Sequence, residues 1–359
     1  MSKTPLYDCH LQQQAKMVDF CGWDLPIHYG SQLKEHQSVR LDAGVFDVSH
    51  MTITDIHGPD ARAYLRYILS NDVAKLEQHP MGKALYSALL NESGGIIDDL
   101  IVYRCANAYR LITNAATLQK VHAWLTLKSQ AFNIRLQPRA DLAILAVQGP
   151  NAIAKVAALK PHLATALCVL KSFASLNDQD WQFARTGYTG EMGLEILLPA
   201  NEAACFWQAL MAIGVSPCGL AARDTLRLEA GLNLYGHDMD ESVSPLECNI
   251  VFAVDLRDVT RQFIGKDAYL ALKASARQRH QIGLSLASGG ILREGQKIFD
   301  GEKEIGVITS GTFSPSLKYS IALARVQAPV TKPFVEIRGA RLAVQTTAIP
   351  FINATLKGC

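Results

Sequence analysis

The chain has 359 residues, of which 49% are hydrophobic, and its 35 Lys and Arg against 33 Asp and Glu give a net charge of +2. This length and composition predict a compact protein of two or three domains. The even charge balance, without a long basic run, excludes an extended electrostatic surface for nucleic acid or a membrane, so we expect a small molecule or another protein as the partner.

The eight cysteines form no C-x-x-C pair and no Cys/His zinc spacing, which predicts free buried thiols in a reducing compartment and no disulfide framework. The first residues, MSKTPLYDCHLQQQ, contain neither an apolar core nor an Arg-rich amphipathic leader. We therefore expect no signal or transit peptide and a cytoplasmic location. The longest chargeless run, 203–222, is interrupted by Gly214 and Pro217, which indicates a helix of a globular domain that ends at Gly214.

In chain order, the sequence predicts a short helix, strands and a helix near 32–40 within residues 1–52. Two later segments, MTITDIHGPDARAYL at 51–65 and LAILAVQGPNAIAKV at 142–156, share one design. Each runs from an alternating strand through a Gly-Pro pair into a helix, with the proline just inside the helix start. This leaves two interpretations open, related βα units in two subdomains or a common way of starting a helix.

Helix and strand patterns alternate from 58 to 138, including a helix over 116–127, and this rhythm is typical of an α+β sandwich. Residues 141–240 resume with a strand, a helix, strands and a helix. From 281 onward strands dominate, with Gly, Ser and Pro in the turns between them, which predicts a small β-barrel or sandwich. The expected strands are QIGLSLAS, ILREGQKIF, IGVITSGTFS and YSIALARV.

The segment NESGGIIDDLIVYRCANAYRLITN at 91–114 places two adjacent acids within a pattern typical of consecutive antiparallel strands. Because side chains alternate between the faces of a strand, Asp99 is expected to share a face with Ile97 and Ile101, and Asp98 to lie on the other apolar face. A buried carboxylate without a partner is costly, so it needs either a structural ion pair or a function. The pattern alone leaves open which acid matters.

A third acid, Glu195, lies in the apolar strand pattern GLEILLP, after a glycine-rich hairpin. Helical spacing puts Arg223 of GLAARDTLRLEAG on an apolar stripe with Leu220 and Leu226. Two interpretations stay open: a structural bridge between Glu195 and Arg223, or recognition of the flat edge of a pterin-like or guanine-like ring. The sequence contains no dinucleotide, P-loop, zincin or serine hydrolase motif.

With these residues in place, the chain resembles the T proteins of the glycine cleavage system, which are tetrahydrofolate-dependent aminomethyltransferases. The resemblance implies an α+β fold in which three domains pack as a cloverleaf around a central folate pocket, the first two interleaved and the third a small β-barrel or jelly-roll-like domain. The implied domains are 1–52 with 139–240, 53–138 with 241–278, and 279–359. The resemblance rests on blocks in family order: MVDFCGWDLPIHYG, AGVFDVSHM, GGIIDDLIVY, VQGPNA, RTGYTGEMGLE, CGLAARDTLRLEAGLNLYG and IGVITSGTFSPSL.

The resemblance also implies a reaction. The aminomethyl group on the lipoyl arm of H protein passes to tetrahydrofolate, ammonia is released, and 5,10-methylenetetrahydrofolate forms without a metal. It implies Asp99 as the catalytic acid near N10 of the folate, Glu195 on the pterin edge and Arg223 beside it. The other implied pocket residues are Met51, Tyr86, Ile101, Tyr103, Asn114 and Tyr188.

Two alternatives accompany this interpretation. The first is another folate-dependent one-carbon transferase or a demethylase, which would share the pterin pocket without needing a lipoyl carrier. The second is a folate-binding protein without transferase activity. Relatives of that second kind carry a lysine-glycine-cysteine-tyrosine type motif, which this sequence lacks.

Overall fold

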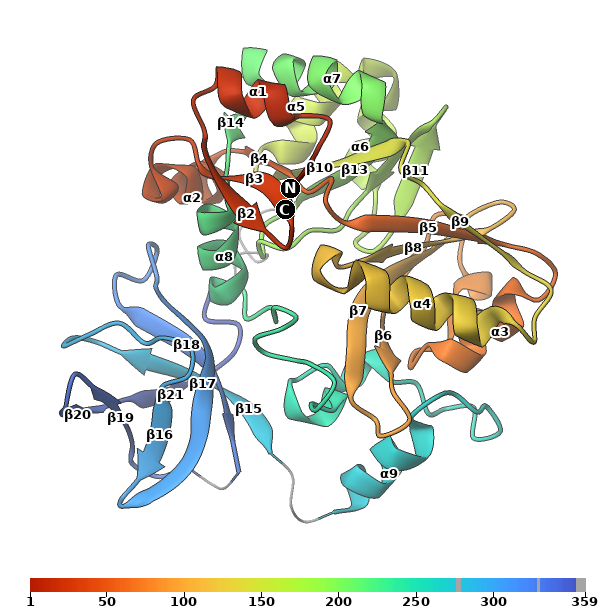
Figure 1. Ribbon diagram of the computed structural model, residues 1–359. Helices are drawn as coiled ribbons and strands as arrows, with labels where there is room; N and C mark the ends of the chain where they lie inside the picture. The colour runs from red at the N-terminus through yellow and green to blue at the C-terminus, as the bar shows by residue number, and fades with distance from the viewer. Residues whose placement is uncertain (276–278, 328–329, 353–359) are drawn as a thin grey trace.

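The structure is a computed structural model that describes residues 1–275, 279–327 and 330–352, arranged as three lobes (Figure 1). The helices are α1 Tyr7–Gln12, α2 Gln32–Leu41, α3 Ala61–Ile68, α4 Leu118–Ser129, α5 Ala152–Leu159, α6 Ala164–Val169, α7 Ala200–Ala212, α8 Leu220–Glu229 and α9 Lys266–Ala274. The strands are β1 Ser2–Lys3, β2 Lys16–Phe20, β3 Trp23–His28, β4 Gly44–Asp47, β5 Thr52–His57, β6 Ala84–Leu90, β7 Ile96–Arg104, β8 Tyr109–Thr113, β9 Arg135–Pro138, β10 Leu142–Gln148, β11 Ser175–Asp178, β12 Trp181–Ala184, β13 Gly193–Pro199, β14 Ser216–Pro217, β15 His280–Leu286, β16 Lys297–Asp300, β17 Lys303–Phe313, β18 Ser320–Val326, β19 Pro333–Ile337, β20 Ala340–Ala343 and β21 Gln345–Thr347.

The first lobe is built on a six-stranded sheet in the order β11-β12-β13-β10-β4-β14. Its strand β10 is buried along its whole length because both of its faces are covered. Ala143, Leu145 and Val147 pack with helices α5 and α7, whereas Ile144 and Ala146 pack against the second sheet. This explains why the sequence of β10 is hydrophobic throughout instead of alternating with polar residues.

The second lobe is built on a five-stranded antiparallel sheet in the order β6-β7-β8-β5-β9. Helices α3 and α4 cover one face, and the other face meets the first sheet through a shared apolar core. The chain enters this sheet after β4 and returns to the first sheet at β10, so the two lobes are interleaved in sequence. The predicted α+β class is confirmed, and the domain boundaries stay a prediction.

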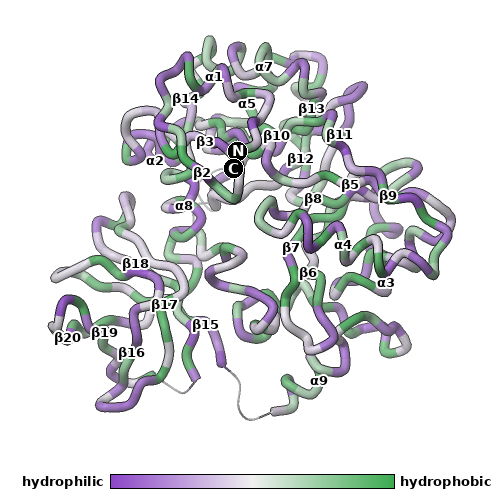
Figure 2. Tube along the Cα trace, viewed as in Figure 1, coloured by the Kyte–Doolittle hydropathy of each residue, from purple (hydrophilic) through white to green (hydrophobic). Residues whose placement is uncertain are grey.

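The third lobe is a seven-stranded antiparallel sheet in the order β20-β19-β16-β17-β18-β15-β21, which curls around its own core. The predicted β-rich C-terminal domain is confirmed, although β16 begins only at Lys297, because residues 291–296 form the turn that precedes it. Residues 276–278 of the expected second domain, and 328–329 and 353–359 of the expected third, lie outside the described residues. Figure 2 shows hydrophobic and hydrophilic segments in every lobe.

The two Gly-Pro segments differ from the prediction in one detail. Pro59 and Pro150 lie one residue before the N-cap residues Asp60 and Asn151, and are therefore outside α3 and α5. The preceding glycines, Gly58 and Gly149, have φ of +119° and +133°, and a Cβ there would meet backbone oxygens of Asn133 and Asp42 at 2.4 Å. Both turns therefore require glycine, and both interpretations of the repeat remain open.

The cysteines were only partly predicted. Seven cysteines are free in the described part of the chain, and Cys359 lies outside it. Cys9, Cys218 and Cys248 are buried as expected, whereas Cys21, Cys168 and Cys205 are exposed.

Within the described ranges, no helix is both long and apolar enough to span a bilayer.

Candidate active site

The acid pair lies on β7, and the structure joins it to two other predicted pocket residues. The amide nitrogen Nδ2 of Asn114 lies 2.8 Å from Asp98 Oδ1 and 2.8 Å from Asp99 Oδ1, so it donates to both carboxylates. The hydroxyl of Tyr86 donates to Asp99 Oδ2 over 3.0 Å. Asp98 is completely buried and Asp99 is half-buried. Tyr86, Asp99 and Asn114 therefore form one hydrogen-bonded group.

The expected alternation along β7 is wrong at its start. The pairing of β6 with β7 shifts by one residue, because Leu89 lies opposite Asp98 whereas Leu90 lies opposite Ile96. This β-bulge puts Ile97 in the core under α3 and α4, and Ile96 in a different core. A bulge inserts one unpaired residue, so the face on which Asp99 lies continues to Ile96 instead of Ile97.

Burial raises the pKa of Asp99, and the hydrogen bonds from Tyr86 and Asn114 oppose this rise because they favour the charged form. Burial also raises the pKa of Asp98, and the neighbouring Asp99 carboxylate raises it further. Since the two groups interact, they titrate as a pair. The pair can hold a proton at a pH where an exposed carboxyl would have lost it.

Glu195 lies on β13, where it faces the contact between the first two lobes. The hydroxyl of Thr186 donates to Glu195 Oε2, and this hydroxyl lies 3.3 Å from that of the fully buried Tyr103 on β7. Glu195 Oε1 makes no hydrogen bond with a described residue. Burial raises the pKa of Glu195, while the Thr186 hydrogen bond and the charge of Arg223 oppose the rise.

Arg223 projects from α8 with its guanidinium 4.5 Å from the ring centre of Tyr188. This guanidinium makes no hydrogen bond and no ion pair within 4.0 Å with any other described residue, so the structural bridge to Glu195 is not formed. Its charge nevertheless lowers the pKa of both Asp99 and Glu195. Arg223 is thus close enough to influence both acids, and it links the two halves of the predicted site.

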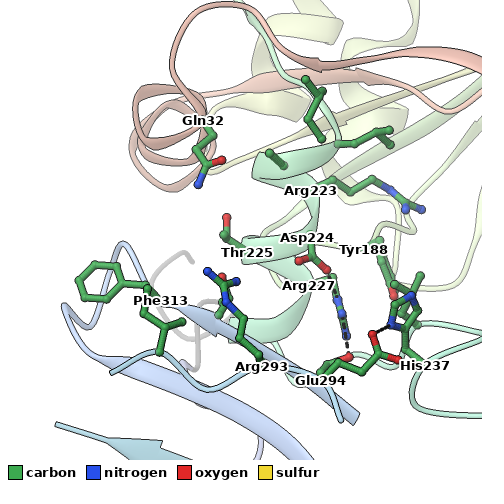
Figure 3. Close-up of a pocket in the computed structure, with 18 of the residues that line it drawn as sticks. Gln32, Tyr188, Arg223, Asp224, Thr225, Arg227, His237, Arg293, Glu294 and Phe313 are labelled. Atoms are coloured by element: carbon green, nitrogen blue, oxygen red, sulfur yellow. Dashed lines mark hydrogen bonds and ion pairs between the residues drawn. The ribbon is translucent and has the colours of Figure 1, made fainter. Parts of the chain in front are cut away.

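A cavity of about 720 Å³ opens beside this arginine, between α8, the N-terminal segments and the C-terminal lobe. Figure 3 shows Arg223 and Arg227 extending from α8 along it, with Phe313 on the C-terminal lobe. Tyr188 and Arg223 are the predicted residues that line this cavity. The other predicted residues do not line it: Met51, Ile101 and Tyr103 lie in the core between the first two sheets, and Tyr86 packs with residues 235–263.

Met51 and Ile101 are half-buried and pack against the core between the first two sheets, to which Tyr103 also belongs.

The sequence patterns did not identify two neighbours of the predicted residues, Thr186 and Phe252. Thr186 lies outside the strands, and no spacing rule relates it to Glu195. Phe252 is 65% exposed, with its ring centre 5.6 Å from that of Tyr86, and a solitary aromatic residue in a loop pattern carries no signal.

Among the described residues, no group of three or more His, Cys, Asp or Glu is arranged to hold a metal ion. The polar groups described here are instead three acids of raised pKa, one arginine without an acid partner and several hydroxyl and amide groups. Such a set suits hydrogen bonding to a flat polar ring and transfer of a proton.

Comparison with known families decides the identity of the fold. Residues 6–258 match the GCVT N-terminal domain, and residues 279–353 match the glycine cleavage T-protein C-terminal barrel domain. The chain belongs to the glycine cleavage T-protein family.

Similar proteins within the T-protein family extend over the whole chain. The aminomethyltransferase of Chromobacterium violaceum is 54% identical over 98% of this chain and 97% of that protein. The aminomethyltransferase of Neisseria meningitidis is 51% identical with the same coverage. The crystal structure of glycine cleavage system aminomethyltransferase T from Bartonella henselae superimposes with a TM-score of 0.90 at 36% identity, and covers 98% of each chain. The predicted enzyme class, an aminomethyltransferase of the glycine cleavage system, is confirmed.

Proposed function

We propose that this member of the T-protein family takes the aminomethyl group from lipoylated H protein, releases ammonia and forms 5,10-methylenetetrahydrofolate on tetrahydrofolate. Family membership supports the reaction type. The observation that carries the proposal for this chain is that Asp99 is held by Tyr86 and Asn114, Glu195 keeps one oxygen without a described partner, and the charge of Arg223 acts on both acids.

The free hydrogen-bonding groups fit the pterin ring of the folate. Glu195 keeps one oxygen, Oε1, for N–H donors of a ring edge, since only Oε2 accepts from Thr186. Arg223 has unused donors for a ring carbonyl, and Tyr188 offers an aromatic surface beside it. We assign folate binding to Glu195, Arg223 and Tyr188, and to Met51, Tyr86, Ile101, Tyr103 and Asn114 around them.

Asp99 is proposed as the catalytic acid. Its carboxylate is held by Tyr86 and Asn114, so it is oriented before the substrate arrives. It can accept a hydrogen bond from the folate nitrogen and stabilise the positive charge that develops as ammonia leaves. The partially buried setting strengthens this electrostatic effect compared with water.

Lipoylated H protein is proposed as the partner that delivers the aminomethyl group. The cavity of about 720 Å³ gives a route to Arg223 and Tyr188 from the side of the C-terminal lobe. An extended carrier arm would enter through such an opening.

The test replaces Asp99 by asparagine, which preserves shape and removes the charge. We expect Asp99→Asn to reduce turnover by roughly 10²- to 10⁴-fold, as for loss of a general acid–base group, while tetrahydrofolate binding stays within about threefold. Methylenetetrahydrofolate and ammonia are measured with purified protein, tetrahydrofolate and aminomethylated H protein. Turnover like that of the wild type would disprove the assignment of Asp99 as the catalytic acid.

Asp55→Asn serves as the matched control. Asp55 is also a buried acid of the five-stranded sheet, but it pairs with Arg110 and Arg139 and lies outside the proposed site. A second control omits H protein. Turnover of free dimethylated substrates without H protein would favour a demethylase instead.

A further inference from the structure

Asp98, the other member of the acid pair, has no role in the reaction proposed above. Its side chain is completely buried, and no Lys, Arg or His of the described chain lies within 4.0 Å of its carboxylate. Burying a carboxylate without a cation costs folding free energy unless hydrogen bonds compensate for the lost water. Since Asp98 forms no ion pair, its burial needs another explanation.

The polar contacts of Asp98 come from Asn114 and from Thr117 of the same turn, and two of them are made by Asn114. The backbone N–H of Asn114 donates to Asp98 Oδ2 over 3.1 Å, and its side-chain Nδ2 donates to Asp98 Oδ1 over 2.8 Å. The hydroxyl of Thr117 donates to the backbone oxygen of Asn114 over 2.9 Å. Asn114 is therefore held through its backbone and its side chain, where β8 leads into the short helical turn before α4.

The orientation of the Asn114 amide follows from these contacts. An amide NH₂ group has two hydrogens, and its two shortest contacts are the 2.8 Å bonds to Asp98 and Asp99. In the flipped orientation, the amide oxygen would face two carboxylates and both hydrogen bonds would be lost. With Nδ2 fixed, the Oδ1 atom makes no hydrogen bond with a described residue and is free to accept one from a ligand.

We propose that Asp98 is a positioning residue, which orients the amide of Asn114 and, through it, the carboxylate of Asp99. This inference rests on the function proposed above, in which Asp99 is the catalytic group. Asp98 itself touches neither substrate. Its effect is to keep one donor directed at Asp99 Oδ1 while Tyr86 directs another at Oδ2.

The experiment compares Asp98→Asn, Asn114→Ala and the double variant with the wild type. We expect Asp98→Asn to lower kcat by roughly 10- to 100-fold, as for small misplacements of catalytic groups, with the Kd for tetrahydrofolate within about threefold. Because both residues act through one linkage, the double variant should be no more than about threefold slower than the slower single variant. Fully additive losses would overturn the proposal.

The pH profile gives a readout that a merely structural role would leave unchanged. Two interacting acids give two macroscopic ionisations, so Asp98→Asn should remove one ionisation from the profile of kcat. Asp55→Asn makes the same substitution at a buried acid that pairs with Arg110 and Arg139, and it should leave the profile and kcat unchanged. Wild-type kcat with an unchanged profile in Asp98→Asn would disprove the positioning role.

Failure of this inference is distinguishable from failure of the proposed function. If the wild type itself shows no turnover with H protein, the proposed function fails. In that case the pH dependence of tetrahydrofolate binding, measured by calorimetry, still tests Asp98, and the same loss of one ionisation is expected. Should Asp98→Asn not fold, Asn114→Ala removes the same linkage at a half-buried position and should show the same loss of kcat.

Discussion

The guanidinium of Arg223 lies against the ring of Tyr188 and has no carboxylate within 4.0 Å in the described part of the chain. Burial lowers the pKa of Arg223, and the nearby Tyr188 and Glu195 oppose this effect. Glu195 likewise keeps one oxygen without a described partner. Both residues therefore pay a desolvation cost in the free protein that a ligand with a complementary edge would offset.

The hydrogen bond from Tyr86 leads to a prediction about the pKa of Asp99. Its hydroxyl favours the charged form of Asp99, so Tyr86→Phe should raise the pKa of Asp99 further. The acidic limb of kcat/KM then moves to higher pH. A hydrogen bond to a charged group contributes ~1.5–3 kcal/mol, so turnover on that limb should fall by roughly 10- to 150-fold. The measurement is the pH profile of methylenetetrahydrofolate formation.

Tyr103→Phe is the control for Tyr86→Phe. The hydroxyl of Tyr103 lies near Thr186 and not near Asp99, so its loss should leave the acidic limb in place. An identical shift in both variants would show that the effect does not arise from the contact with Asp99.

The charged residues of the site could be predicted from the sequence, because Asp99, Glu195 and Arg223 interrupt apolar patterns in which charges are costly. The contacts between these residues and their neighbours could not be predicted. Thr186 reaches Tyr103 across 83 positions of sequence, and Asn114 joins two side chains that strict alternation would send to opposite faces. Such contacts depend on sheet pairing and on the bulge in β7, which local patterns do not encode.

At the scale of elements, the strands and most helices were predictable because their periodicity is local. The order of the strands within each sheet was not predictable. β10 pairs with β4 and β5 pairs with β9, in each case across a long stretch of intervening chain. Only the hydrophobic faces of these strands were visible in sequence, and many different partners would bury them equally well.

Helix α8 carries a buried acid that joins the first lobe to the C-terminal lobe. Glu229 is fully buried and accepts hydrogen bonds from Arg40 on α2 and from Ser314 and Ser316 after β17. Removing one partner of such a buried group leaves the others unpaired. We expect Glu229→Gln to lower the free energy of unfolding by about 3 kcal/mol, measured by urea denaturation.

Glu304→Gln is the matched control on the surface of the C-terminal lobe. Glu304 pairs with Lys297, and both side chains are largely exposed. Exposed ion pairs contribute little, so this variant should keep the denaturation midpoint of the wild type. Equal losses of unfolding free energy in both variants would show that the effect does not depend on the burial of Glu229.

At the scale of the whole molecule, Glu229 also predicts how the protein responds to acid. Burial alone would raise its pKa, but hydrogen bonds from His36 and Ser314 and the charges of His36 and Arg40 outweigh burial and lower the pKa from 4.5 to about 2. A folded-state pKa below the unfolded one stabilises the protein above pH 4.5, and this stability is lost as the pH falls towards 2. The midpoint of thermal unfolding should therefore drop across this window.

Glu229→Gln should flatten that decline, because the variant has no carboxyl to protonate at this position. Unfolding temperatures measured for both proteins between pH 5 and pH 2 should converge as the pH falls. A constant difference over the whole range would contradict the assignment of this pH dependence to Glu229.

One helix thus meets the proposed ligand and the C-terminal lobe on successive turns. Arg223 faces the cavity, while Arg227 contacts Asp238 and Ser310 at 2.9 Å, and Glu229 holds the segment after β17. Thermodynamic linkage is reciprocal: if folate binding at Arg223 strengthens the contacts of α8 with the C-terminal lobe, those contacts strengthen folate binding by the same free energy. Tetrahydrofolate should therefore slow amide hydrogen exchange in β17, a strand of another lobe, and a loosened C-terminal lobe should weaken folate binding without any change to the residues that touch the folate.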